Sequence, residues 1–115
     1  MKDFRDLDVL HASHDLVVLI HDISQSFPET EPFGVATAIS SAALAIPRSI
    51  VNGCGRGSDE ELKLGLLHAS GFASELEYLM LLAGEVGIID DETLEEFALT
   101  LSEFKTRMSE ELGEL

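Results

Sequence analysis

The segment between Pro32 and Asn52 limits the possible folds of this chain more than any other stretch, because Arg48 is its only charged side chain. Small and aliphatic residues fill most of the segment, so a helix over this range would be apolar on several sides. Other parts of the protein would have to shield each of these sides from water. The chain has 115 residues, which suits one domain whose core is too small to surround such a helix. We therefore expect residues 1–115 to form a single domain, with one face of this helix against another subunit.

Two stripes are candidates for that subunit interface. One is the small-residue side of the segment described above. The other lies near the N-terminus, where His11, His14 and His21 share a sector of about 80° on a helix, away from its main apolar stripe. Protonation of such histidines near pH 6 would weaken assembly. The predicted interface residues are Ala36, Ile39, Ser40, Ala43, Ile46, His14, Val18 and His21.

Apolar residues recur at three- and four-residue spacing in four segments, which predicts four helices. The predicted ranges are about 7–27, 32–52, 59–85 and 91–115. Short links between long helices favour antiparallel neighbours, so the expected fold is all-α, an up-down-up-down four-helix bundle. On the third helix, Glu75 shares a side with Phe72 and Leu79, and we expect it to be a partly buried structural carboxylate. The acidic face of the fourth helix, Glu111 included, is expected to be solvated.

Helix ends have their own signals in this sequence. Ser58 followed three residues later by Glu61 predicts a capping box at the start of the third helix. Gly87 suits the residue after that helix ends. Asp90 or Asp91 is the expected N-cap of the fourth helix.

The glycine-rich stretch before the third helix could be a hinge, a phosphate-binding loop or an active site. A P-loop needs a preceding strand and a lysine, and both are missing here. Pro47 removes one helical hydrogen bond, which predicts a kink in the second helix, fixed or acting as a hinge. We interpret Pro47, Gly53, Gly55, Gly57 and Ser58 as an architectural kink and turn.

Candidate enzyme sites are incomplete. Asp8-x-x-His11 has the spacing of a carboxylate–histidine ligand pair, but a helical di-iron site needs a second such pair and two further glutamates. Arg5 and His11 fit the short R-x4–6-H element of HEPN-type ribonucleases, without a basic surface to support it. No nucleophile stands beside a base in a recognisable context. We therefore predict no enzyme activity, no metal and no cofactor.

Charge disfavours a broad nucleic-acid surface. The formal net charge is −15, from 22 acidic and 7 basic residues, and the basic residues form no cluster in the sequence. The one cysteine, Cys54, allows no intramolecular disulfide. The charged start does not resemble a signal peptide, and no uncharged apolar run reaches the roughly 18 residues of a membrane span. These features predict a cytoplasmic protein without a membrane partner.

Short motifs follow one another in a fixed order along nearly the whole chain. They include Phe4-Arg5-Asp6-Leu7-x-Val9, Phe27-Pro28, Ile46-Pro47, Ser74-Glu75-Leu76-Glu77 and Gly87-Ile88-Ile89. In this order and spacing the chain resembles the four-helix-bundle proteins encoded in intervening sequences of bacterial 23S rRNA genes. The resemblance implies a ring-like homopentamer of four-helix protomers with no established enzymatic activity, for which a nucleic-acid-related scaffolding role has been supposed.

The second helix departs from the pattern of that family. The family usually has Gln-Ile-Arg-Arg-Ala where this chain has Ala38-Ile39-Ser40-Ser41-Ala42. The Ile-Pro pair and the later Gly53 are kept, whereas the paired arginines are gone. We therefore predict a non-enzymatic, homo-oligomeric scaffold or interaction module, with a pentamer favoured. The alternative is RNA or ribonucleoprotein binding, and a weaker one is a metal-dependent or ribonuclease-type enzyme.

Overall fold

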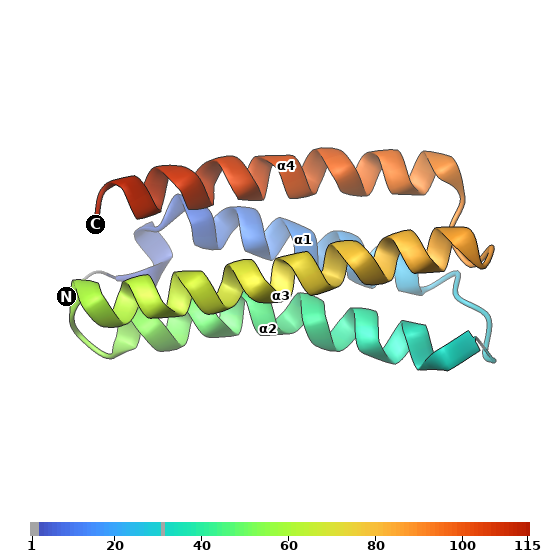
Figure 1. The fold of residues 1–115 in the computed structure, drawn as a ribbon, viewed down its shortest axis with the longest axis horizontal. Helices are drawn as coiled ribbons and strands as arrows, with labels where there is room; N and C mark the ends of the chain where they lie inside the picture. Colours follow the sequence, from blue (N-terminus) through green and yellow to red (C-terminus); the bar gives the residue numbers. More distant parts are fainter. Residues whose placement is uncertain (1–2, 31) are drawn as a thin grey trace.

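The computed structural model describes residues 3–30 and 32–115. These residues form four α-helices and two short 3₁₀ turns, Phe4–Asp6 and Pro32–Gly34, and contain no strand. The all-α prediction is therefore confirmed. Successive helices run in opposite directions and lie side by side (Figure 1). The helices are α1 (Asp8–Ser24), α2 (Val35–Gly55), α3 (Asp59–Glu85) and α4 (Asp91–Gly113).

Two helices have ends that differ from the predicted ones. α1 stops at Ser24, where the Ser24 hydroxyl and the Gln25 amide both donate to the His21 carbonyl. α2 begins only at Val35, because the two preceding residues have φ near +65° and cannot continue a right-handed helix. It then runs past Gly53 to Gly55, with Pro47 inside a continuous helix. The kink at Pro47 stays a prediction.

The predicted N-cap hydrogen bonds of α3 and α4 are present, while the second half of the capping box, from Glu61 back to Ser58, stays a prediction. The Ser58 hydroxyl accepts the Glu61 backbone N–H at 3.1 Å, and the Asp90 carboxylate accepts the Thr93 backbone N–H at 2.8 Å. The hydrogen bond from Thr93 lowers the pKa of Asp90. Gly87, with φ of +84°, follows the end of α3 in the left-handed conformation that suits glycine. Local sequence chemistry thus sets where α3 begins and ends and where α4 begins.

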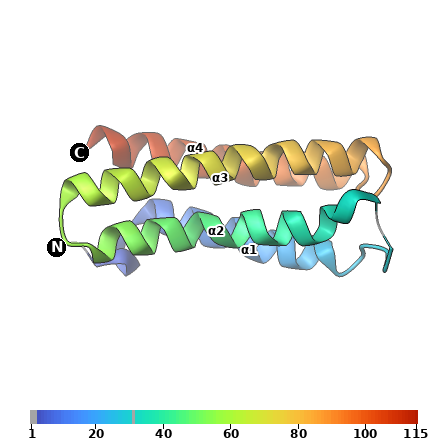
Figure 2. The ribbon, with the colours of Figure 1, turned by 60° about the horizontal axis from the view of Figure 1, so that its bottom comes forward.

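Each helix packs against two neighbours. α1 contacts α2 and α4, α3 contacts the same two helices, and the α2·α3 contact is the most extensive. In the view of Figure 2, α2 and α3 lie in front and α1 and α4 behind them. The α2·α3 face and the α1·α4 face are therefore opposite sides of a bundle with extents of 44 × 22 × 19 Å.

The core confirms most of the predicted apolar stripes and corrects three assignments. Glu75 is exposed and Phe72 is 36% exposed, so the side of α3 that they share faces outward. Glu111, expected on the solvated face of α4, is only 9% exposed. It lies seven residues after Phe104, which places it on the same face as that buried ring. The largest fully buried side chains include Phe104, Leu16, Ile39, Ile46, Ile50, Leu66, Leu76 and Met80.

By length and mean hydropathy, α2 is the one helix within residues 3–30 and 32–115 that could cross a bilayer. Of its most apolar window, 33% is buried inside the bundle. A core helix meets the same criteria, so this property by itself assigns no membrane role.

Candidate functional site

α2 and α3 touch backbone to backbone at Gly53 and Gly65. A Cβ atom added to Gly53 would lie 2.9 Å from the Gly65 Cα and from the Glu61 carbonyl oxygen. One added to Gly65 would lie 2.6 Å from the Ser49 carbonyl oxygen. Real side chains do not fit at such distances from backbone atoms. We call this contact the glycine seam, and Gly53 belongs to it rather than ending the helix.

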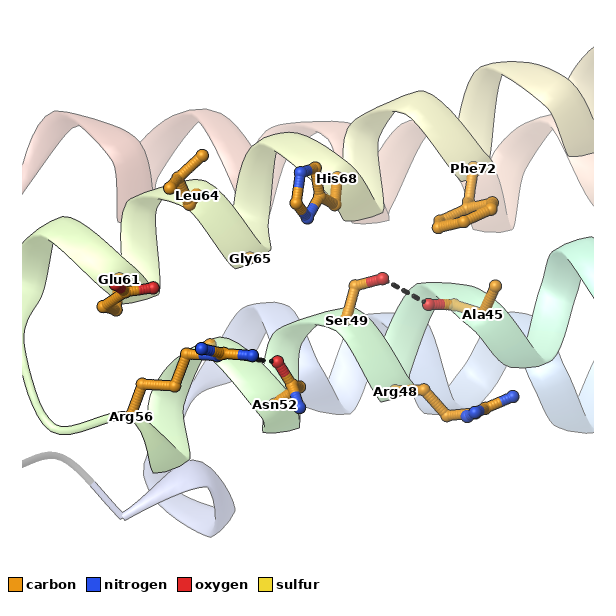
Figure 3. Close-up of a pocket in the computed structure, with 11 residues that line it drawn as sticks. Ala45, Arg48, Ser49, Asn52, Arg56, Glu61, Leu64, Gly65, His68 and Phe72 are labelled. Carbon is orange, nitrogen blue, oxygen red and sulfur yellow. Dashed lines mark hydrogen bonds between the residues drawn. The ribbon is translucent and has the colours of Figure 1, made fainter.

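The glycine seam forms the floor of a groove between α2 and α3, with a volume of about 580 Å³. Figure 3 shows His68 and Phe72 of α3 opposite Ser49 and Ala45 of α2, with Arg48, Asn52 and Arg56 along the outer side of α2. We call it the α2·α3 groove. Its remaining lining residues are Ala45, Ser49, Gly53, Glu61, Leu64 and Gly65.

The arginines of the α2·α3 groove differ from most other cations of the described chain. Neither Arg48 nor Arg56 has a carboxylate within ion-pair distance among residues 3–30 and 32–115, and Arg56 Nε donates only to the Asn52 side-chain oxygen, at 3.1 Å. Three of the four other lysines and arginines in the described residues are paired: Arg5 with Asp3 at 2.9 Å, Lys105 with Glu77 at 3.0 Å, and Arg107 with Glu103 at 2.8 Å. Among the described residues, the two arginines of the α2·α3 groove therefore have no carboxylate partner, so they can meet an external negative charge.

A second groove lies on the opposite face of the bundle, between α1 and α4, and we call it the α1·α4 groove. Carboxylates line both of its sides, and no lysine or arginine of residues 3–30 and 32–115 lines it. Two apolar side chains that line this groove are exposed to solvent, Val18 by 46% and Leu99 by 75%. Its acidic residues are Asp15 and Asp22 on α1 and Glu96 and Glu103 on α4. The linings of the two grooves thus differ in charge, with two arginines and one glutamate at the α2·α3 groove and four carboxylates at the α1·α4 groove.

α3 also presents apolar residues on the side that faces away from the core. Leu67 is 48%, Tyr78 64% and Leu81 61% exposed, and they follow one another at helical spacing. Leu64, 50% exposed, belongs both to this row and to the α2·α3 groove. We call Leu64, Leu67, Gly71, Tyr78 and Leu81 the outer α3 stripe. It adjoins the α2·α3 groove at Leu64.

The predicted interface residues separate into two groups. Ile39, Ala43 and Ile46 are between 0% and 2% exposed, so they belong to the core of the single chain and cannot meet a partner. The prediction placed them on a second face of α2 because a sequence alone does not tell which apolar side points inward. The others, Ala36, Ser40, His14, Val18 and His21, are half-buried or exposed.

The residues considered for enzyme chemistry lie apart from both grooves or are engaged in local contacts. The His11 ring nitrogen Nε2 lies 2.8 Å from the Arg5 backbone carbonyl, while the Arg5 guanidinium binds Asp3. In the α2·α3 groove, the Ser49 hydroxyl donates to the Ala45 carbonyl at 2.8 Å instead of to His68. Within the described part of the chain, no three or more His, Cys, Asp or Glu residues are placed to hold a metal ion.

Sequence reasoning missed Gly65 and the outer α3 stripe. A signal for the glycine seam is present, because small residues recur every fourth position on both helices. Ala45, Ser49 and Gly53 form such a row on α2, and Gly65, Ala69 and Ala73 form one on α3. Such rows allow two helices to approach closely.

The sequence matches the family model described as 23S rRNA-intervening sequence protein over residues 5–110. The chain belongs to this family. The match spans all of α1, α2 and α3 and most of α4. A search of curated proteins finds no match. As a 23S rRNA-intervening sequence protein, the chain joins a family for which no catalytic role is known.

Proposed function

We propose that this 23S rRNA-intervening sequence protein is a non-enzymatic helical module of the cytoplasm that assembles with copies of itself, with a pentamer favoured. The outer α3 stripe is the observation that carries the proposal. A single large exposed apolar side chain is ordinary on a protein surface, whereas several on one side of a helix favour an interaction site. The row lies on the longest helix and adjoins the α2·α3 groove, so a partner could cover both at once.

The oligomeric state of the purified protein tests this proposal directly. Light scattering coupled to size exclusion should give a mass of about five times the 12.5 kDa of the chain. A mass of 12.5 kDa at micromolar concentration would overturn the proposal. Any other closed oligomer would support self-assembly and contradict only the pentamer.

Substitutions in the outer α3 stripe test which surface is used. Leu67→Asp combined with Leu81→Asp places charges on two exposed side chains, so the protomer should stay helical while the oligomer dissociates. Leu10→Asp would not be a matched control, because Leu10 packs against the core. Val86→Asp is better suited, since Val86 is 38% exposed and lies after α3 ends. An oligomer that survives the double substitution would show that the outer α3 stripe is not the interface.

A second candidate function is RNA binding, favoured by the unpaired Arg48 and Arg56. Two arginines in a chain of net charge −15 give at most a small, focused phosphate site. Filter binding with 23S rRNA fragments at several salt concentrations tests it. Tight binding that falls steeply with added salt, and that is lost in the variant Arg48→Ala/Arg56→Ala, would favour this function over self-assembly alone.

A further inference from the structure

We propose that the α1·α4 groove of one copy docks onto the α2·α3 groove of the next copy, so that the two opposite faces of the bundle form one head-to-tail interface. The proposal rests on the self-assembly proposed above and adds its mode. It concerns which surfaces meet, and it holds for any number of subunits.

Charge is the first argument. The α2·α3 groove presents Arg48 and Arg56, with His68 between the helices and Glu61 as its single carboxylate. The α1·α4 groove presents Asp15, Asp22 and Glu96, with His14 beside them and with Glu103, which Arg107 of the same chain already pairs at 2.8 Å. Docking one onto the other brings the two unpaired arginines to the carboxylate-rich side of a neighbour. Complementary charges of this kind guide association and fix which surfaces pair.

The same charges oppose a two-fold dimer. A two-fold axis places the same patch of both subunits against itself. Pairing the α1·α4 groove with itself would collect two sets of Asp15, Asp22 and Glu96 in one interface, and pairing the α2·α3 groove with itself would bring four arginines together with only two copies of Glu61. Like charges at an interface cost several kcal/mol. The head-to-tail arrangement is the one that avoids both.

Apolar side chains supply the second argument, because each groove carries exposed ones. Leu64 and Phe72 are 50% and 36% exposed at the α2·α3 groove, and Val18 and Leu99 are 46% and 75% exposed at the α1·α4 groove. These side chains would come into contact when the two grooves meet, and their burial would favour association. The charges then select the pairing, and the apolar contacts stabilise it.

The α2·α3 and α1·α4 helix pairs lie on opposite sides of the bundle (Figure 2), so a contact between their grooves leaves one groove free on each outer subunit. A head-to-tail contact of this type repeats until a ring closes, or continues as a filament if the rotation does not close. The proposal therefore explains why assembly would go beyond a dimer.

Charge reversal tests the pairing. The basic-groove variant, Arg48→Glu/Arg56→Glu, and the acidic-groove variant, Asp15→Lys/Glu96→Lys, change exposed residues only. Each should be monomeric by light scattering, since each then opposes like charges. A chain with all four substitutions has exchanged the charges of its two grooves, so it should assemble again. An equimolar mixture of the two double variants should form mixed complexes by native mass spectrometry.

Other results would overturn the proposal. If only the basic-groove variant dissociates, the α2·α3 groove pairs with itself. If the fourfold variant is folded but stays monomeric, the two grooves do not meet. Lys63→Glu and Glu95→Lys/Glu114→Lys are controls outside both grooves and should keep the wild-type mass. A monomeric wild type would instead refute self-assembly itself, so the two failures are distinguishable. Circular dichroism checks that every variant is helical.

Salt titration of the wild-type protein gives a second measurement that needs no substitution. Raising NaCl from 0.1 to 1 M shortens the Debye length from about 10 to 3 Å, so it should weaken docking that charge directs. The oligomer should dissociate at a higher protein concentration in 1 M salt than in 0.1 M salt. An oligomer whose dissociation is the same in both, or that tightens in high salt, would argue for a purely apolar interface and against this pairing.

Discussion

The α2·α3 pair and the α1·α4 pair form the same bundle by different means. On α3, four of the buried residues, Gly65, Ala69, Ala73 and Ala83, are glycine or alanine. On α4, the buried residues are Phe97, Leu101, Phe104, Met108 and Glu111, all of them large. The first pair is held by the close approach of two backbones, the second by side-chain volume. An added atom should therefore damage the first pair, and a removed atom the second.

The largest effect is expected where side-chain volume matters most. Phe104 is 1% exposed on α4, and Phe104→Ala should lower the free energy of unfolding by about 3–5 kcal/mol because it leaves a cavity. Urea denaturation followed by circular dichroism measures it. Phe104→Leu, which leaves a smaller cavity, should cost less. Equal losses for the two variants would contradict the volume argument.

An added methyl group at the glycine seam should have the next largest effect. Gly53→Ala should lower the free energy of unfolding by about 1–3 kcal/mol, because its Cβ meets backbone atoms that cannot rotate away. Gly55→Ala is a matched control two residues later on α2, where an added Cβ meets nothing within 4 Å. The control should change stability by no more than about 0.5 kcal/mol in the same urea experiment. Similar losses in both would mean that the seam is not the cause.

Removing the cap of α3 should have a smaller effect. Ser58→Ala deletes the hydroxyl that accepts the Glu61 backbone N–H, and it should cost about 1 kcal/mol. Ser58→Asp keeps an acceptor at this helix start and should restore most of the loss. A thermal melt of the three proteins is sufficient. If Ser58→Asp is as unstable as Ser58→Ala, the hydrogen bond is not what Ser58 contributes.

The cap of α4 should differ from that of α3 in its dependence on pH. The hydrogen bond from Thr93 lowers the pKa of Asp90 below its ordinary value of 3.8. A carboxyl group with a lowered pKa stabilises the fold above its unfolded pKa and loses that contribution as the pH falls through the folded pKa. The difference in melting temperature between wild type and Asp90→Ala should therefore be present at pH 7 and shrink toward pH 3. The difference in melting temperature between wild type and Ser58→Ala should not shrink in this way between pH 7 and pH 3. A constant difference for Asp90→Ala would contradict the assignment.

Local chemistry allowed the four helices, both ends of α3 and the start of α4 to be predicted. Ser58, Gly87 and Asp90 act within one turn of their own helix, so the sequence around them contains all the necessary information. The starts of α3 and α4 were predicted for this reason. The start of α2 was not, because the left-handed conformation of Phe33 depends on how the preceding turn packs, and no glycine marks that position.

Faces and contacts between helices were predicted less well. Phe72 and Glu75 were expected to be inward because apolar residues occur on both sides of α3, and periodicity does not say which side meets the core. Glu111 was expected outward because of its charge, although its seven-residue distance from Phe104 places it on the core side. Each groove is formed by residues of two helices that lie side by side. The sequence pattern of one helix therefore could not predict either groove.

The glycine seam also limits how this chain can change in evolution. A crowded core position can often be rescued by a smaller neighbour elsewhere. At Gly53 and Gly65 the atoms that would be crowded are carbonyl oxygens and Cα atoms, which every residue type carries. No second substitution can therefore make room for a side chain there. Another residue type could replace glycine at these two positions only if an entire helix moved. Such a movement would also change the distance between the arginines of α2 and the helix α3.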